Sequence, residues 1–424
     1  MPRSRSLEDP RPSHAKGREQ EGGAPERRAA SPGDRSSRKR ELIADSVITV
    51  LSEAGINGLT HRRVAQAAGI SLSATTYHYA TKADMLADAS QSLLSDYLDA
   101  FRRTARDHRE GSGRDESPQA FMARLLANAT GRHRRESIAW CEIILDAAKS
   151  PEGHELARHW FKELHEVWSA LWKAFGADGD AVDVQIAIDT VIGLMFIVLP
   201  LNFEPAQVAD FRSRAWVDAL ADLAAQASPS AAPDRALGRK AQATRARIVA
   251  AAIRILEQEG VSGVSYRAVA KESGVALTAP AYYFGSIEAL IRVAESEMFE
   301  ASKARYRQIL SVANLSEPSA ETLADLTAAI LVREATEFSA ASLAHYSVWL
   351  AATRSESLRP AVASAVIDQI KAWERRISHL PTAREGDGTY IQALFHGQCI
   401  RNLACGAPIV DLANIRGFFL RILS

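Results

Sequence analysis

The feature that most constrains this chain is an internal repeat that runs without a gap. GISLSATTYHYATKADML at residues 69–86 returns 205 residues later as GVALTAPAYYFGSIEALI at 274–291. The same register holds before this stretch, and fainter matches follow it at offsets of 204 to 205. Two copies of a unit of about 190 residues therefore make up the chain. Matching pairs include Leu51 with Leu256, Gly55 with Gly260, Trp168 with Trp373, and Gly193 with Gly397.

Both units are predicted to be all-helical. Apolar residues recur at helical spacing, as at Ile43, Val47 and Leu51, and no stretch shows sustained strand alternation. Gly55 and Gly260 are expected to end the first helix of each unit, and Thr60 and Ser265 are suited to cap the next. Longer helical stretches are predicted at 117–149, 152–175, 183–200, 205–227, 320–353, 358–379, 389–404 and 408–423.

The chain divides into six predicted segments. Its start is rich in Pro, Gly, Ser and Arg without an apolar run, which predicts disorder, and Pro and Ser mark a linker between the copies. The segments are a tail at 1–37, a helix-turn-helix domain at 38–91, a helical regulatory domain at 92–225, a linker at 226–238, a second helix-turn-helix domain at 239–296 and a second helical regulatory domain at 297–424.

Composition limits the class of protein. Lys and Arg total 51, as do Asp and Glu, so a nucleic-acid partner would be held by a local basic patch. Three cysteines without metal-ligand spacing fit free thiols in a reducing cytoplasm. The apolar run at 190–201 is shorter than the roughly 20 residues of a membrane span, so a core helix is expected. No catalytic constellation, metal site or cofactor motif is indicated, and an enzyme is not expected.

The repeated stretch has the pattern of a helix-turn-helix. Such a unit needs a glycine where its first helix ends, an apolar residue that pins the turn, and small or polar side chains on the outer face of its second helix. Gly69 and Ile70 meet the first two needs in the first copy, and Gly274 and Val275 meet them in the second. The second helix of such a unit can lie in the major groove of DNA.

GLTHRRVAQAAGISLSATTYHYATKADML resembles the N-terminal DNA-binding domain of the TetR family of bacterial transcriptional regulators, and GVSYRAVAKESGVALTAPAYYFGSIEALI resembles the same domain. The resemblance implies helical subunits of nine helices that dimerise through their last two. It also implies an effector pocket in the middle helices that shifts the separation of two DNA-reading heads. The expected fold is therefore all-α: two tandem TetR-like units, each a helix-turn-helix DNA-binding domain followed by a helical ligand-binding and dimerisation domain.

Residues expected to contact DNA come from both heads. Small, hydroxyl-bearing and aromatic side chains can reach base edges and phosphates, and Lys82 is expected to reach a phosphate as a point charge. In the second copy Ile287 replaces this lysine and Ala276 replaces a capping serine, which predicts a weakened or retargeted head. The predicted contacts are Thr60, His61, Arg62, Ser71, Leu72, Ser73, Ala74, Thr75, Thr76, Tyr77, His78 and Lys82 in the first head, and Arg267, Thr278, Tyr282 and Tyr283 in the second.

Aromatic residues of the helical domains are candidates for an effector pocket, although aromatic side chains at helical spacing are more often plain core. The candidates are Trp140, Trp168, Trp172 and Phe196 in the first unit, and Trp349, Trp373 and His396 in the second.

The sequence thus predicts a sequence-specific DNA-binding transcriptional regulator: a ligand-responsive repressor acting as a fused pseudo-dimer in the cytoplasm. Its expected partners are a double-stranded DNA operator and an unknown small-molecule effector, with no membrane partner. The alternative is a sensor or protein-interaction module of the same fold that no longer reads DNA. The last helices of the two units pair either within one chain, giving a monomeric pseudo-dimer, or between chains, giving a homodimer with four heads.

Overall fold

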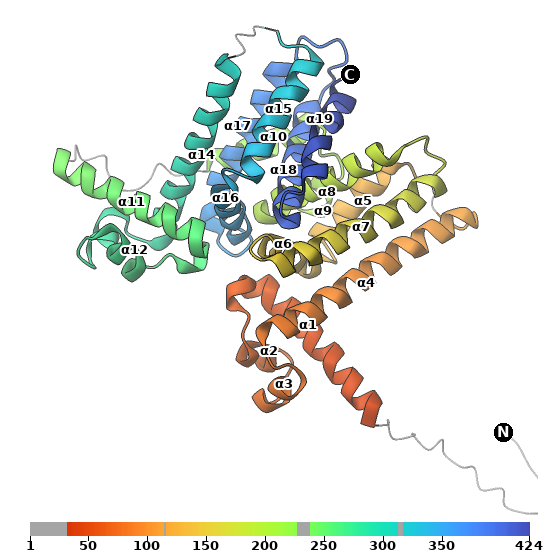
Figure 1. Cartoon of the computed structure of the whole chain (residues 1–424), viewed down its shortest axis with the longest axis horizontal. Helices are drawn as coiled ribbons and strands as arrows, with labels where there is room; N and C mark the ends of the chain where they lie inside the picture. Colours follow the sequence, from red (N-terminus) through yellow and green to blue (C-terminus); the bar gives the residue numbers. More distant parts are fainter. Residues whose placement is uncertain (1–31, 114–115, 227–237, 313–316) are drawn as a thin grey trace, which may run out of the picture. The chain divides into compact units, whose positions relative to one another are not determined.

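The computed structural model describes residues 32–113, 116–226, 238–312 and 317–424. Every regular element in these ranges is a helix, which confirms the predicted all-α class (Figure 1). Leu42–Ser424 form one compact body. The predicted tail up to residue 31 and the linker residues 227–237 lie outside the described ranges.

The helices of the two copies follow one another in the same order. Those of the first copy are α1 (Pro32–Gly58), α2 (His61–Ala67), α3 (Leu72–His78), α4 (Lys82–Arg109), α5 (Pro118–Thr130), α6 (Arg134–Ala147), α7 (Pro151–Ala174), α8 (Ala181–Leu201), α9 (Pro205–Val208) and α10 (Arg214–Ala225). Those of the second are α11 (Arg239–Glu259), α12 (Tyr266–Ser273), α13 (Ala279–Phe284), α14 (Ile287–Val312), α15 (Ala320–Ala335), α16 (Ser339–Ala351), α17 (Arg359–Ile377), α18 (Asp387–Cys405) and α19 (Ile409–Leu423).

The first helix of each copy ends in the same way. Gly55 interrupts α1 with φ +66°, and Gly260 follows α11 with φ +71°, a backbone conformation that only glycine adopts readily. The short 3-10 helix η1 (Val261–Gly263) then leads into α12. At its other end α1 begins at Pro32, so residues 32–37, which the sequence analysis placed in the tail, are helical.

Side-chain caps fix the starts of the short helices. The hydroxyl of Thr60 accepts from the backbone N of Arg63, and Ser265 does the same for Ala268, each at 3.2 Å, as predicted. Ser71 caps α3 through the backbone N of Ala74 at 3.2 Å. In the second copy Ala276 stands at the position of Ser71, and the residue before α13, Thr278, makes no side-chain cap.

Three predicted helical stretches are each two helices. The stretch 117–149 breaks after Thr130, where Gly131 leaves helical geometry with φ −101° and ψ −112°, and Pro205 packs close beside it. The stretch 320–353 breaks at the equivalent place, after Ala335. The stretch 205–227 contains only one turn, α9, before α10 begins at Arg214.

The two copies pack together through α8 and α18. The helices cross so closely at Gly193 and Gly397 that a Cβ on Gly193 would overlap the carbonyl oxygen of Ala393, and one on Gly397 would overlap that of Asp189. α8 is long and apolar enough to cross a membrane, but 94% of its most apolar window is buried inside the protein, as expected of a core helix.

The final helices depart from this two-fold arrangement. α10, which ends the first copy, packs against α17 of the second copy, whereas α19, which ends the second copy, packs against α15 of its own copy. The two halves are therefore related but not equivalent.

Candidate nucleic-acid interface and effector cavity

The first head presents an exposed face on α3. Tyr77 is 84% exposed and Leu72 is 47% exposed, although both are large and apolar. The hydroxyl residues Ser71, Ser73 and Thr76 are also exposed on this head. Thr60 and Arg62, at the start of α2, are exposed as well, while His61, Ala74 and His78 are half-buried. A face of this kind can meet thymine methyl groups and base edges.

Thr75 does not belong to this face. Its side chain is fully buried, and its hydroxyl donates to the carbonyl of Leu72 at 2.8 Å. The equivalent residue of the second head, Pro280, is also buried. The prediction that Thr75 faces DNA was wrong, because this position of the helix points into the head.

The second head repeats the exposed pair at the same two positions. Tyr282 is 81% exposed and Leu277 is 58% exposed, and they align with Tyr77 and Leu72. Arg267 and Thr278 are exposed on the same head, and Tyr283 is half-buried. Two copies of one exposed apolar pair, each beside a helix-turn-helix, indicate a shared contact surface.

Lys82 has a partner within its own head. Its Nζ donates to the carbonyl oxygen of Ile56 at 2.6 Å, and the side chain is half-buried. The lysine thus satisfies a carbonyl at the end of α1. In the second head Ile287 packs against the apolar core at this position. From the sequence, Lys82 was expected to contact only a DNA phosphate, and its hydrogen bond to Ile56 was not predicted.

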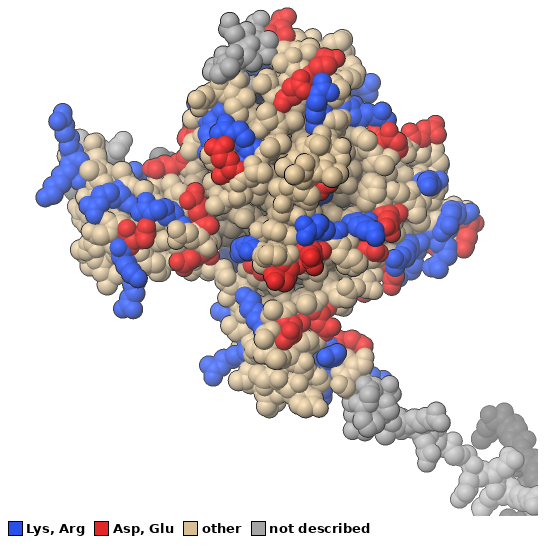
Figure 2. Space-filling view, viewed as in Figure 1, with Lys and Arg blue, Asp and Glu red and all other residues tan. Residues whose placement is uncertain are grey.

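The second head carries more net positive charge than the first. Residues 239–296 contain eight Lys and Arg against five Asp and Glu, whereas residues 38–91 contain six against five. On the face drawn in Figure 2, Lys and Arg side chains gather over the second head, around α11 and α12. The second head is therefore the stronger candidate for sequence-independent attraction to phosphates.

The helical domains carry cavities at equivalent places. In the first unit a small cavity of about 70 Å³ is bounded by Trp140, Trp160 and Trp168 together with apolar side chains from α7 and α8. Trp160 is fully buried, and its indole N–H donates to the hydroxyl of Ser90 at 3.1 Å. Tryptophan side chains therefore fill most of this space.

In the second unit the corresponding space is open and polar. Two adjoining cavities of about 280 and 230 Å³ share Phe299, Tyr306, Gln369 and Phe395 as walls. The aligned pairs show the change of chemistry, from apolar in the first unit to polar in the second: Leu164 with Gln369, Ile188 with Gln392, Ile192 with His396, and Ala129 with Glu334.

A hydrogen-bond network lines the two cavities of the second unit. The hydroxyl of Tyr346 lies 2.9 Å from Nδ1 of His396, and the amide of Gln392 lies 2.6 Å from its Nε2. Burial, with a smaller effect from His345, lowers the pKa of His396 to about 3. The ring is therefore neutral near pH 7 and can both donate and accept. Opposite it, Arg305 donates to the carboxylate of Glu334 at 2.9 Å.

The predicted pocket residues are only partly brought together. Trp140 and Trp168 border the small first cavity, and Trp373 and His396 each border one of the second-unit cavities. Trp172 instead borders a hollow of about 450 Å³ between the units. Phe196 packs edge-on against Tyr346 of the other copy, and Trp349 is fully buried with its N–H donated to Glu295. Neither Phe196 nor Trp349 borders the cavities described above.

Two helix-turn-helix heads on helical domains define a DNA-binding transcription regulator, and comparison with known families agrees. The family model described as "Tetracyclin repressor-like, C-terminal domain" matches residues 113–226 and 318–424, one region in each unit and together more than half of the chain. The model described as "Bacterial regulatory proteins, tetR family" matches residues 248–294, which contain the second head. The chain belongs to the TetR family. No curated protein matches it.

Proposed function

We propose that this protein is a ligand-responsive repressor that binds a double-stranded operator as a pseudo-dimer within one chain, in the cytoplasm. The observation that carries the proposal is the packing of α8 against α18, which joins one long helix of each copy inside a single polypeptide. One chain then presents two heads, as a dimer of single-headed subunits does.

The two heads are proposed to read related but different half-sites. Tyr77 and Tyr282 are common to both, whereas His78 aligns with Tyr283 and Ser73 with Thr278. A homodimer must present the same face twice, but a fused chain is free of that constraint. An operator with two unequal halves is the expected target.

The effector is proposed to bind in the second unit alone. Its two adjoining cavities approach the size of small-molecule sites, whereas the 70 Å³ of the first unit is too small for an organic ligand. Aromatic walls and a buried row of hydrogen-bonding side chains suit a planar aromatic compound that carries polar groups.

The proposal is tested by selecting fragments bound from a genomic DNA library at low salt, followed by footprinting of the selected sites. The expected result is one site per chain with two adjacent protected segments of different sequence. Retention of no duplex at low salt would instead support a sensor of the same fold that does not read DNA. Transcription in vitro from a promoter carrying the selected site should fall when the protein is added; a rise would identify an activator.

A further inference from the structure

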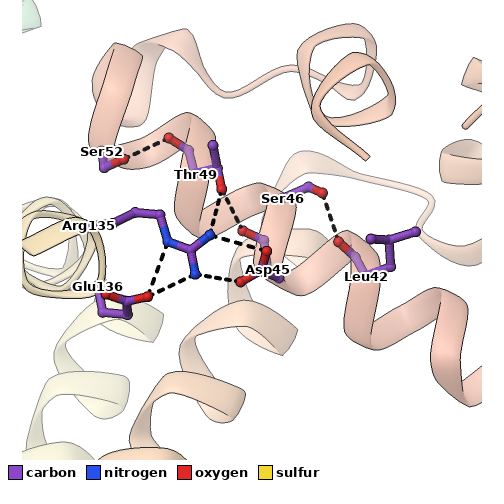
Figure 3. A network of polar contacts seen from close by, with 7 residues as sticks. All are labelled: Leu42, Asp45, Ser46, Thr49, Ser52, Arg135 and Glu136. Atoms are coloured by element: carbon purple, nitrogen blue, oxygen red, sulfur yellow. Dashed lines mark hydrogen bonds and ion pairs between the residues drawn. The ribbon is translucent and has the colours of Figure 1, made fainter. Parts of the chain in front are cut away.

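One helix of the first unit, α6, holds the first head at two points. At its start, Arg135 donates to Asp45 at 2.6 Å and to Thr49 at 3.1 Å, both on α1, while Glu136 accepts from the same guanidinium at 2.8 Å (Figure 3). Further along α6, the buried carboxylate of Glu142 accepts from the backbone N–H of Ile56 at 3.0 Å. The first contact fixes the side of α1, and the second fixes the backbone just beyond its break at Gly55.

The second unit reaches the same carboxylate. The guanidinium of Arg354, three residues beyond the end of α16, lies 2.8 Å from Oε1 of Glu142. It also lies over Gly55, where an added Cβ would come within 2.9 Å of it. One buried carboxylate therefore joins the backbone of the first head to a cation of the other copy.

The helix that leads to Arg354 also forms a wall of the second-unit cavity. Ala341, Ser342, His345 and Tyr346 line that cavity, and all four lie on α16. α16 and α18 both pack against α6. An occupant that displaces α16 would therefore move Arg354 relative to Glu142, and with it the grip on Ile56.

The second head lacks these contacts to the other copy among the described residues, but α16 touches it directly, since Nδ1 of His345 lies 2.7 Å from Oε1 of Glu295, and Ile253 and Glu257 of α11 line the cavity. At the offset of 205, Arg135 aligns with Ala340 and Asp45 with Ala250. Ser347 aligns with Glu142, and its hydroxyl donates to Ala344 of its own helix. Lys149 aligns with Arg354 and pairs with Asp146 in its own turn at 3.1 Å. The carboxylate–guanidinium link between the copies therefore runs one way only, from the second unit to the first head, whereas α16 contacts the second head within its own unit.

We propose that a ligand in the cavity of the second unit acts across the pseudo-dimer on the first head, through α16, Arg354 and Glu142. This inference rests on the proposed function in taking that cavity as the effector site. The ligand shifts the first head to the extent that it binds the two positions of α16 with different affinity.

The test follows backbone hydrogen exchange in the full chain without DNA, comparing residues 53–60 of the first head with residues 258–265 of the second. Two probes stand in for the ligand: the substitution Ala341→Phe, which fills the cavity from α16, and 8-anilinonaphthalene-1-sulfonate added to the wild type. Each should change exchange in 53–60 about fivefold, the low end of allosteric coupling.

Arg354→Met should abolish the change in 53–60 and leave the response of 258–265 as in the wild type, and the matched variant Lys149→Met should preserve both. Glu142→Gln keeps an acceptor for Ile56 but removes the charge that holds Arg354, so it should also break the response without exposing the Ile56 amide. A change confined to 258–265, or a response of 53–60 that survives in Arg354→Met, would overturn the proposal. Should Ala341→Phe fail to fold, the dye arm decides.

The same variants separate this inference from the proposed function. Arg354→Met should alter footprint protection of one half-site only, while Lys149→Met alters neither. Loss of all DNA binding in the wild type would refute the proposed function and leave the exchange result standing. If DNA binding were intact but neither probe changed hydrogen exchange in residues 53–60, only the proposed coupling through α16, Arg354 and Glu142 would be refuted.

Discussion

Asp189 of the first copy accepts a hydrogen bond from Nε of Arg401 of the second copy at 3.0 Å, and both side chains are buried where α8 crosses α18. At the offset of 204 that relates the two crossing glycines, these residues align with Ala393 and Ile197. The ion pair therefore occurs on one side of the crossing only. Pairing of two like units would bury either a carboxylate or a guanidinium against apolar side chains, which costs several kcal/mol per ion.

Breaking this pair should cost more than removing it. Arg401→Ile leaves the buried carboxylate of Asp189 without a cation and should lower the free energy of unfolding by about 3–5 kcal/mol. Asp189→Ala should cost less, because Arg401 keeps a second carboxylate, that of Asp411 at 3.2 Å. The double variant, which copies the residues at the equivalent positions, should recover most of that loss. Urea unfolding followed by tryptophan fluorescence measures all three. A double variant no more stable than the worse single variant would contradict this reasoning.

The exposed tyrosines should each control one half of the operator. Tyr77→Ala and Tyr282→Ala should each weaken binding by about 1–3 kcal/mol, with protection lost from a different half-site, because each removes an apolar contact from one head. Quantitative footprinting makes the comparison. Ile409→Ala, which removes an equally exposed apolar side chain from α19, serves as the control and should bind like the wild type. Loss of both half-sites in either tyrosine variant would show that the heads do not bind independently.

Lys82 and Ile287 provide a reciprocal test of one position. Lys82→Met should lower stability by about 1 kcal/mol, because the carbonyl of Ile56 loses a charged donor. An ammonium has three donors, so we expect the phosphate contact as well, with the slope of log affinity against log salt falling by about one unit. Ile287→Lys should raise that slope by a similar amount. Salt titrations by fluorescence anisotropy distinguish these outcomes, and an unchanged slope in Lys82→Met would make its role purely structural.

The polar cavity should lose its ligand affinity when it is given the residues of the first unit. Gln369→Leu combined with Cys399→Met copies Leu164 and Met195, and it should weaken binding of 8-anilinonaphthalene-1-sulfonate about tenfold, equivalent to 1.4 kcal/mol. Leu164→Met, a volume-conserving change beside the small first cavity, should leave dye binding unchanged. If Leu164→Met weakened dye binding more than the double variant did, the dye would bind in the first unit, which would contradict the proposal.

His396 should make the protein sensitive to moderate acid. Burial, aided by His345, holds the pKa of this ring at about 3 in the folded protein, against about 6.5 when unfolded. As the pH falls below 6.5, His396 binds a proton in the unfolded chain but stays neutral in the folded chain. The contribution of His396 to the free energy of unfolding is therefore highest above pH 6.5 and declines as the pH falls toward 3. Between pH 6.5 and 5 the loss is about 2 kcal/mol. His396→Gln should lessen this decline, and a pH profile of unfolding identical to that of the wild type would refute the assignment.

Local signals in the sequence were sufficient for the backbone of the heads. Thr60 and Ser265 each precede a short helix and cap it, and Gly55 and Gly260 end the first helix of each unit, as the repeat suggested, at positive φ. These features depend on a few neighbouring residues. The duplication strengthened them, because a pattern that occurs twice in one register is not accidental.

Features that depend on tertiary contacts were not predictable in this way. Thr75 has the same chemistry as the exposed Thr76, and only packing of α3 against the rest of the head determines that Thr75 is buried. The contact of Lys82 with Ile56 joins residues 26 positions apart. The link from Arg354 to Glu142 joins two copies and leaves no local pattern at all.

One signal in the sequence was available and went unused. Aligning the copies replaces Leu164, Ile188 and Ile192 with Gln369, Gln392 and His396 on faces whose neighbours stay apolar. Polar side chains at core positions need partners or a ligand. The polar cavity of the second unit could therefore have been located from the alignment, whereas tryptophan content pointed equally to both halves.

Gly193 and Gly397 meet at the crossing of α8 and α18, one from each copy. In an assembly of two identical chains, a mutation at such a helix crossing changes both helices at once, so its effect on the geometry is doubled and symmetric. Here each glycine has its own codon. A substitution at only one of them would therefore widen the crossing from one side, a change that no pair of identical subunits can make.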